Sequence, residues 1–252
     1  MSLRVEKLVF KNRNFTLTVE GLEFESGRLT AIVGPNGAGK TTLLKCLAAI
    51  HPLPRQAVFL GGQDLAGLAL SQRARLIGYV PQEHSPVFSY TVRDFVLTGR
   101  AAHLPLFSLP SARDEAVAQE AMALVGLEPF ADRPYSQLSS GERRLALIAR
   151  ALAQKTHVLF LDEPTTFLDP KHEWQVMEFV SKLASQKGLT VLVTLHNLDM
   201  AVKYSQALVF LKEGRVAAAG RPDDILTEGL LQAVYDLPMK IVACDGRKLI
   251  VR

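Results

Sequence analysis

The sequence is poor in cysteine. Its 252 residues contain only two, Cys46 and Cys244, and they are far apart along the chain. Neither belongs to a pair or cluster with the spacing of a metal site, and two cysteines do not make a disulfide framework. A structural zinc site and a disulfide-stapled scaffold are therefore excluded. We expect both cysteines to pack as small apolar side chains.

Long apolar stretches are also missing. No segment reaches the roughly 20 residues that a membrane-spanning helix needs. The first residues, Met1–Lys7, lack the apolar core of a secretory signal. We expect the chain to be kept in the cytoplasm, so that any role at a membrane comes through a partner protein.

Charge of one sign does not dominate. The formal net charge is +4, and Lys and Arg are scattered without a long basic run, which argues against a nucleic-acid partner. Hydrophobic residues make up 48% of the chain and charged residues 21%, so an ordinary globular core is expected. The length fits one large domain or a domain with an inserted subdomain.

A glycine-rich stretch is the most informative feature present. It matches the pattern G-x-x-x-x-G-K-S/T and comprises Gly34, Pro35, Asn36, Gly37, Ala38, Gly39, Lys40, Thr41 and Thr42. An apolar run that predicts a strand, Leu29–Val33, precedes it, and a predicted helix, Leu43–Ala49, follows. Glycines let main-chain N–H groups and the helix N-terminus face phosphates together. Lys40 would reach the β- and γ-phosphates and Thr41 would bind Mg²⁺, so the stretch predicts a nucleoside triphosphate site.

Three further apolar runs predict strands buried on both faces of a mainly parallel sheet. They are Ile77–Val80, Val158–Leu161 and Thr190–Leu195. Each leads into polar side chains, which are Gln82, Asp162 with Glu163, and His196 respectively. Ligands of such sheets bind at the carboxyl ends of the strands. We therefore expect Lys40 and these four side chains to converge on one site.

The remaining segments differ in pattern. Residues 1–25 and 55–65 alternate as antiparallel strands do, and residues 86–154 are mostly helical in character. Ala207–Ala219 predicts a hairpin, and Lys240–Val251 predicts another with Asp245-Gly246 as its turn. We expect a single domain over residues 1–252. Residues 1–85 and 155–220 would form its α/β core with an antiparallel part, residues 86–154 a helical subdomain, and residues 221–252 a C-terminal helix and hairpin.

A second motif lies in the helical stretch. Leu138 and the residues Ser139, Ser140, Gly141 and Glu142 precede a helix predicted over Arg143–Ala153. Ser at a helix start is good capping chemistry, and Ser with Gly at such a start also suits an anion. An ordinary helix cap is the alternative.

With this motif the chain resembles the ATP-binding-cassette (ABC) ATPases along nearly its whole length. The motifs occur in that family's order, namely Walker A at residues 34–42, the Q-loop at Gln82, the signature at 138–142, Walker B ending at Asp162, the D-loop ending at Asp169, and the switch histidine at His196. Ser140 and Glu142 depart from the usual Leu-Ser-Gly-Gly-Gln signature, and Thr166-Phe167 departs from the usual D-loop. For the aromatic side chain that stacks on adenine, both Phe10 and Phe15 are candidates.

The resemblance implies a P-loop NTPase fold of class α/β, with an antiparallel β subdomain and an inserted α-helical subdomain. It implies that Glu163 is the general base, that His196 and Gln82 assist it, and that Thr41, Gln82 and Asp162 hold Mg²⁺ beside ATP. Two copies would form a homodimer in which Ser139, Ser140, Gly141 and Glu142 contact the ATP of the partner subunit. Asp169 would couple the two sites.

Three stretches resemble the ATPases of iron-siderophore, haem and cobalamin importers. They are Gly99–His103, Ala149–Gln154 and Leu195–Ala201. This resemblance implies membrane permease subunits as partners, a solute-binding protein acting indirectly, and a location on the cytoplasmic face of the membrane. The stretch Val87–Arg100 would dock a permease helix, or else pack within the helical subdomain. An oxyanion importer, such as one for molybdate, and a soluble cassette, as in iron-sulfur cluster assembly, are the alternatives.

Overall fold

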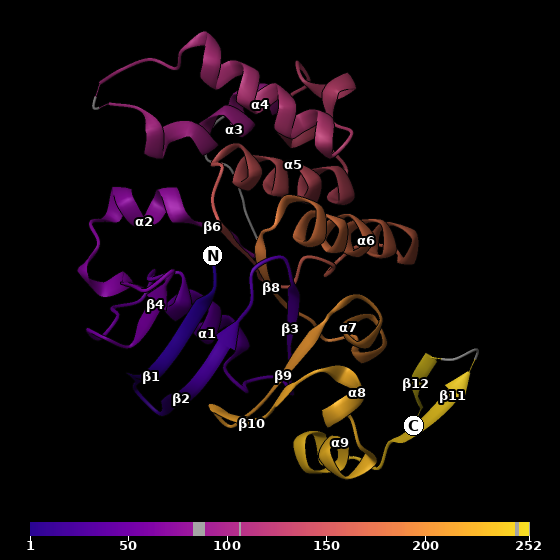
Figure 1. Ribbon diagram of the computed structural model, residues 1–252. Coiled ribbons are helices and arrows are strands. Elements are labelled where there is room, and N and C mark those ends of the chain that lie inside the picture. Colours follow the sequence, from indigo (N-terminus) through magenta and orange to yellow (C-terminus); the bar gives the residue numbers. More distant parts are fainter. Residues whose placement is uncertain (83–88, 106, 245–246, 252) are drawn as a thin grey trace.

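A curled mixed sheet forms the centre of the molecule (Figure 1). The computed structural model describes residues 1–82, 89–105, 107–244 and 247–251. Within these residues the sheet has ten strands in the order β5-β4-β1-β2-β10-β9-β3-β8-β7-β6. The strands are β1 (Leu3–Asn12), β2 (Phe15–Phe24), β3 (Leu29–Val33), β4 (Val58–Leu60), β5 (Gln63–Asp64), β6 (Ile77–Val80), β7 (Val158–Leu161), β8 (Thr190–Thr194), β9 (Ala207–Lys212) and β10 (Arg215–Gly220).

The parallel half of the sheet positions the site. Strands β9, β3, β8, β7 and β6 are parallel neighbours, so their carboxyl ends meet at one edge. Every residue of β3, β7 and β8 is buried, as the near-continuous apolar runs predicted. The prediction of a P-loop α/β fold is confirmed, and the observed strands differ from the predicted ones by a few residues at their ends.

Two hydrophobic cores cover the two faces of the parallel strands. Ile32, Phe160 and Leu192 face the core shared with α1 (Lys40–Leu47) and the antiparallel strands. The alternate residues face the other core, which includes helices α5 (Ser140–Ala153), α6 (Pro170–Lys187), α7 (Leu198–Tyr204) and α9 (Glu228–Tyr235). This alternation follows from the two-residue period of a strand. Cys46 lies fully buried in the α1 core, as expected.

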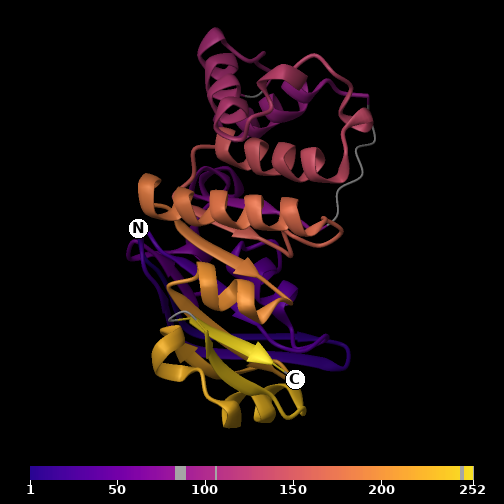
Figure 2. The same cartoon turned by 90° about the vertical axis from the view of Figure 1, so that its right-hand side faces the viewer.

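The described residues between 89 and 154 form helices and turns at one end of the molecule (Figures 1 and 2). They include α3 (Val92–Leu97), α4 (Ala112–Leu124) and α5, with short 3₁₀ helices η2 (Thr98–His103), η3 (Glu128–Phe130) and η4 (Tyr135–Gln137). A buried ion pair of 2.9 Å joins Arg100 to Asp114 and ties α4 to η2. The helical character of this stretch is confirmed, and its status as a separate subdomain stays a prediction.

The C-terminal residues lie at the opposite end, beside α7 (Figure 1). They comprise α8 (Pro222–Ile225), α9, β11 (Lys240–Cys244) and β12 (Arg247–Val251), and the two strands pair antiparallel. The predicted Asp245-Gly246 turn lies outside the described residues, as does the side chain of Cys244. Strand β12 is fixed to α7 because the Ile250 main-chain N–H donates to Asp199 at 2.9 Å.

Two shorter elements complete the chain, α2 (Leu70–Leu76) and the 3₁₀ helix η1 (Leu65–Gly67). None of the helices among the described residues is both long enough and apolar enough to cross a bilayer.

Candidate functional site

The glycine loop connects β3 to α1 in a conformation that requires glycine. Gly34 has a φ of 152°, and a Cβ atom there would lie 2.1 Å from the main-chain oxygen of Leu211. Gly39 has a φ of 102°, and its Cβ would meet the Phe15 ring at 2.6 Å. Because Gly39 caps the helix in the left-handed conformation, α1 begins at Lys40, three residues earlier than the apolar pattern predicted. The predicted site residues Lys40 and Thr41 therefore lie in the first helical turn, where main-chain N–H groups are free to bind an anion.

Lys40 is folded back over its own loop. Its ammonium group donates to the main-chain oxygens of Gly34 at 2.9 Å and Pro35 at 3.1 Å, and the residue is buried. Burial lowers the pKa of Lys40, while the carboxylates of Glu163 and Asp162 oppose that shift. The loop thus holds a cation at its centre, with two acidic side chains close enough to act on it.

Asp162 lies at the end of β7 and is 1% exposed. The Thr41 hydroxyl donates to its Oδ1 at 2.9 Å and the Thr194 hydroxyl at 2.8 Å. The Tyr79 hydroxyl donates to Oδ2 at 3.0 Å. Three strands and the first turn of α1 thus converge on one buried carboxylate, as expected for carboxyl ends that share an edge. The same carboxylate raises the pKa of Tyr79, although burial of the phenol is the larger cause.

Glu163 follows directly and is held by three side chains. Gln82 donates to its Oε2 at 2.6 Å, Thr166 donates to the same oxygen at 3.0 Å, and His196 Nε2 lies 2.6 Å from Oε1. The predicted convergence of Gln82, Glu163 and His196 is therefore observed.

The backbone at Glu163 is strained. Its φ is 47°, in the left-handed region that only glycine adopts readily. The Thr194 hydroxyl accepts a hydrogen bond from the Glu163 main-chain N–H at 2.8 Å and stabilises this conformation. Strained residues of this kind concentrate at functional sites.

Arg144 is a site residue that the sequence pattern did not single out. It lies in α5 and is 5% exposed, and its guanidinium group donates to the main-chain oxygens of Pro81, Gln82 and Glu163 at 2.8, 2.8 and 3.0 Å. Burial lowers the pKa of Arg144. Its place two residues after Glu142 was the available signal, but Pro81, Gln82 and Glu163 are 63, 62 and 19 residues away from it in sequence.

The signature residues form a reciprocal cap at the start of α5. The Ser139 hydroxyl accepts from the Glu142 N–H at 3.3 Å, and the Glu142 carboxylate accepts from the Ser139 N–H at 2.7 Å. The hydrogen bond from the Ser139 backbone is the main reason that the pKa of Glu142 is lowered. The helix therefore begins at Ser140, three residues before the predicted Arg143.

His172 lies between Asp169 and the signature residues and brings them close together. It caps α6 by accepting from the His172 N–H at 3.1 Å, and its Oδ2 lies 2.5 Å from His172 Nδ1. A Cβ atom on Gly141 would meet the His172 ring at 3.2 Å. The signature and the D-loop thus lie against each other.

These two motifs are not brought to the glycine loop within one chain. A groove of about 210 Å³ follows the loop and is lined by Phe15, Asn36, Gly37, Gly39, Lys40, Thr41, Thr42, Glu163 and His196. Residues 139–142 and Asp169 do not line it.

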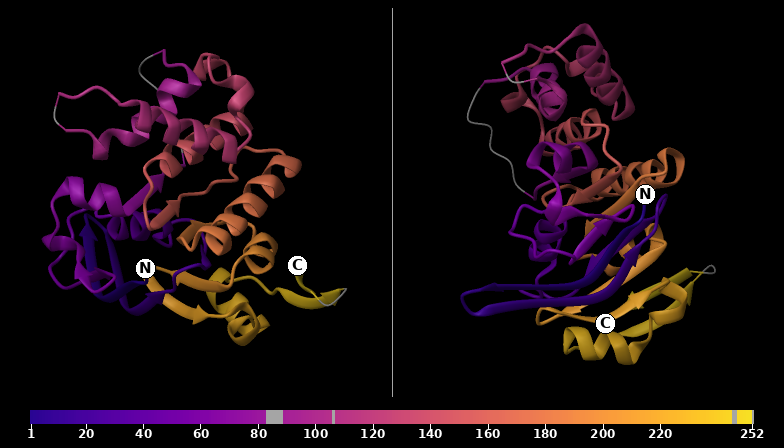
Figure 3. Two further views of the ribbon diagram at one scale, coloured as in Figure 1. Left: turned by 45° about the horizontal axis from the view of Figure 1, so that its top comes forward. Right: turned by 60° about the vertical axis from the view of Figure 1, so that its left-hand side comes forward.

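The two aromatic candidates differ in position. Phe15 begins β2 at the tip of the β1–β2 hairpin, which Figure 3 shows reaching beyond the body of the sheet. It lines the groove and contacts Gly39. Phe10 instead stacks on His51, with ring centroids 4.7 Å apart. The geometry therefore favours Phe15 as the side chain beside a bound base.

The model of the ABC transporter family matches residues 18–166, more than half of the chain. The chain belongs to the ABC transporter family. The resemblance inferred from the ordered motifs is therefore confirmed, and the chain is an ABC ATPase.

Curated relatives of this ABC ATPase include importer subunits. The ferric enterobactin transport ATP-binding protein FepC of Escherichia coli K12 is 37% identical over 241 residues, which cover 95% of this chain and 89% of FepC. The hemin import ATP-binding protein HmuV of Rhodococcus jostii is 41% identical over 217 residues, which cover 86% of this chain and 73% of HmuV.

Solved structures of ABC transporter proteins are also similar to this chain. A chain of a metal-chelate type ABC transporter in an inward-facing conformation matches with a TM-score of 0.86 and 32% identity, over 99% of this chain and 96% of that one. The dimeric ATP-binding cassette MJ0796, bound to ADP and Pi, matches with a TM-score of 0.71 and 25% identity, over 88% of this chain and 98% of that one.

Proposed function

We propose that this ABC ATPase binds ATP with Mg²⁺, hydrolyses it as a homodimer, and thereby powers the import of a metal complex through a membrane permease. The observation that carries the catalytic part is the setting of Glu163. The backbone of Glu163 is strained, and its carboxylate contacts three hydrogen-bonding side chains. Glu163 directly follows Asp162, which accepts a hydrogen bond from Thr41 beside the glycine loop.

The glycine loop would hold the triphosphate. Residues 34–42 offer main-chain N–H groups and the N-terminus of α1, and the Lys40 ammonium group supplies positive charge. Phe15 would stack on the adenine ring from the hairpin side of the groove. The first two contacts favour an anion, and the Phe15 ring favours an anion that carries an aromatic base over a simple phosphate.

The residues near Thr41 fit Mg²⁺. The Thr41 hydroxyl and the Asp162 carboxylate are hard oxygen donors 2.9 Å apart, and Gln82 adds an amide oxygen. Among the described residues no cluster of three His, Cys, Asp or Glu side chains is placed to hold a metal. Mg²⁺ is usually bound through one or two carboxylates together with phosphate oxygens and water, and Asp162 with Thr41 would supply the protein part of such a set. When bound, the ion would neutralise charge on the phosphate oxygens.

Glu163 would act as the general base. One of its oxygens faces His196 and the other faces Gln82 and Thr166, so its side chain is fixed in direction. An attacking water that replaces one of these contacts would lose its proton to Glu163. His196 would keep the carboxylate oriented and contact the γ-phosphate, and Gln82 would help to place the water.

A second copy of the chain would complete the site. The signature residues Ser139–Glu142 lie outside the groove of their own chain, at the N-terminus of a 14-residue helix. In a head-to-tail dimer this N-terminus would face the γ-phosphate of the other subunit, with Asp169 between the two sites. Because it would bind triphosphate better than diphosphate, ATP would close the dimer and hydrolysis would open it.

An importer of an iron chelate, haem, cobalamin or a related metal complex is the favoured role. FepC and HmuV, the relatives described above, support this role. The permease would hold the chain at the cytoplasmic face of the membrane, and a solute-binding protein would deliver the cargo to that permease. A soluble cassette and an oxyanion importer are the competing roles.

Co-purification from native membranes tests this role. We expect a tagged chain to bring an integral membrane permease with it after detergent extraction. Vesicles that contain the complex should take up a ferric siderophore, haem or cobalamin in an ATP-dependent manner, but not molybdate. Recovery of the chain from the cytosolic fraction without a permease would favour the soluble cassette, and molybdate uptake would favour the oxyanion importer.

A further inference from the structure

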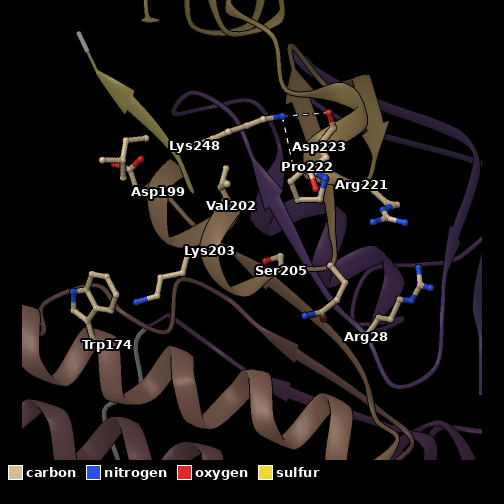
Figure 4. Close-up of a pocket in the computed structure, with 12 residues that line it drawn as sticks. Arg28, Trp174, Asp199, Val202, Lys203, Ser205, Arg221, Pro222, Asp223 and Lys248 are labelled. Atoms are coloured by element: carbon tan, nitrogen blue, oxygen red, sulfur yellow. Dashed lines mark hydrogen bonds and ion pairs between the residues drawn. The ribbon is translucent and has the colours of Figure 1, made fainter. Parts of the chain in front are cut away.

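A second cavity lies at the C-terminal end of the molecule, between α6, α7, α8 and β12 (Figure 4). Its volume is about 740 Å³, against about 210 Å³ for the groove at the glycine loop. The two share no lining residue. Pockets that bind small organic ligands usually have volumes of about 300–1,000 Å³. None of the family motifs described above lies in this cavity, so they give it no role.

The lining carries an excess of positive charge. Arg28, Lys203, Arg221 and Lys248 face two carboxylates, Asp199 and Asp223. Asp223 is paired with Lys248 at 3.5 Å, and Asp199 accepts the main-chain N–H of Ile250. In the part of the chain that the structure describes, Arg221 and Lys203 form no ion pair with a carboxylate.

The arginines lie at one end of the cavity and an aromatic side chain at the other. In Figure 4 the guanidinium groups of Arg28 and Arg221 are on the same side, while Trp174 and Lys203 lie across from them. The Lys203 ammonium group sits 3.5 Å from the centre of the Trp174 ring. Val202, Pro222 and Leu249 add apolar surface to the lining.

One buried polar group in the wall lacks a partner. Ser205 is 7% exposed, and its hydroxyl makes no hydrogen bond to any described residue. A buried hydroxyl without a partner is unfavourable by about 1–3 kcal/mol, so such groups call for an explanation. The Ser205 oxygen is itself covered by protein atoms, so a ligand in the cavity would reach it only if the wall moved.

We propose that this cavity binds a small organic anion, with a phosphate or carboxylate group at Arg221 and Arg28 and an apolar or aromatic body against Val202, Leu249 and Trp174. The cations give the site its selectivity for anions. Arg28 pairs with Glu25 and Lys248 with Asp223, whereas Arg221 and Lys203 have no carboxylate partner among the described residues. The apolar surface selects against a bare inorganic anion, which would leave that surface in contact with water.

The chain carries its own reporter for this proposal. Trp174 is the only tryptophan of the sequence and lines the cavity. A ligand that displaces water or moves Lys203 from the ring changes the tryptophan emission. Phenyl phosphate is a suitable probe because it combines an anionic group with an aromatic body, and inorganic phosphate and benzyl alcohol each carry only one of the two.

We expect phenyl phosphate to change the tryptophan emission of the full chain in a saturable manner. The Arg221→Ala variant should weaken this binding by about tenfold or more, the loss expected for one charge-assisted hydrogen bond, and Arg221→Lys should restore part of it. Arg55→Ala removes the same charge from an exposed arginine that does not line the cavity, and it should bind as the unaltered chain does. Lys40→Ala should also leave this binding unchanged, because the glycine loop is a separate site.

Other results overturn the proposal. An emission that does not change on titration, or equal affinities for Arg221→Ala and Arg55→Ala, would exclude anion binding at Arg221. Equal affinity for inorganic phosphate would exclude the apolar contact, and equal affinity for benzyl alcohol would exclude the ionic one. Loss of the signal in Lys40→Ala would place the probe in the nucleotide site.

Discussion

The guanidinium group of Arg144 donates to the main-chain oxygen of Glu163 at 3.0 Å. The same buried side chain also donates to the carbonyls of Pro81 and Gln82. Arg144 lies in the second turn of the helix that begins with the signature residues. One cation therefore joins that helix to the main chain of both the Q-loop and the candidate base, so a shift of α5 would act directly on the site.

Replacing this cation tests that link. Arg144→Met keeps much of the side-chain length but leaves three carbonyls without their donor, each unfavourable by about 1–3 kcal/mol when buried. We expect the midpoint of chemical unfolding to fall and ATP turnover to fall with it. Arg113→Met, on the exposed face of α4, is the matched control and should unfold as the unaltered chain does. Equal midpoints for the two variants would remove Arg144 from this structural role.

The candidate base can be tested without changing its shape. Glu163→Gln keeps the size and shape of the side chain but cannot take a proton, so ATP turnover should fall by about 10²–10⁴ while ATP affinity is retained. Glu178→Gln, on the exposed face of α6, is the control and should turn over normally. Turnover close to normal in Glu163→Gln would mean that another group accepts the proton.

We expect Lys40 to strengthen the binding of ATP. Lys40→Ala removes a charge-assisted contact to the phosphates worth about 1.5–3 kcal/mol, so the Kd for ATP should rise about 10- to 150-fold. Lys45→Ala, one turn further along α1, removes the same charge and should bind ATP normally. Titration with a fluorescent ATP analogue measures both constants. If the two variants bind alike, the lysine of the glycine loop does not contact the phosphates.

The two aromatic candidates make a natural pair of variants. Stacking of a base on an aromatic ring is worth about 1–3 kcal/mol, so Phe15→Ala should weaken ATP binding at least fivefold. Phe10→Ala removes the stack on His51 and some packing against the core that contains α1, and it should leave the Kd for ATP unchanged. The same titration decides between them, and a larger effect of Phe10→Ala would reverse the assignment.

Much of the site followed from the sequence because its residues come at the ends of buried strands. Parallel strands share an edge, so apolar runs ending at Gln82, Asp162 and His196 were enough to predict their convergence. The hydrogen bonds from Gln82 and His196 to Glu163 agree with that prediction.

Contacts that depend on tertiary packing could not be predicted from the sequence. Arg144 has an ordinary place in an amphipathic helix, and only the packing of α5 against two loops turns it toward their carbonyls. Thr194 and Tyr79 lie within strands and reach Asp162 only because β8, β7 and β6 are neighbours in the sheet. The choice of Phe15 over Phe10 likewise depended on where the β1–β2 hairpin ends.

The glycine loop allows a graded test of backbone geometry. Gly34→Ala would place a Cβ atom 2.1 Å from the Leu211 oxygen at a φ of 152°, so β9 or the loop must move. Gly37 has a φ of 78° but open space around it, so Gly37→Ala should be unfavourable only by about 1–2 kcal/mol of left-handed strain. Gly67 has neither constraint, and Gly67→Ala should be nearly neutral. We expect the free energy of unfolding, measured in denaturant, to be lowered most by Gly34→Ala, less by Gly37→Ala and least by Gly67→Ala. ATP affinity should also be lost most strongly in Gly34→Ala. Equal stabilities of the Gly34 and Gly67 variants would mean that the close approach of the loop to β9 is not required.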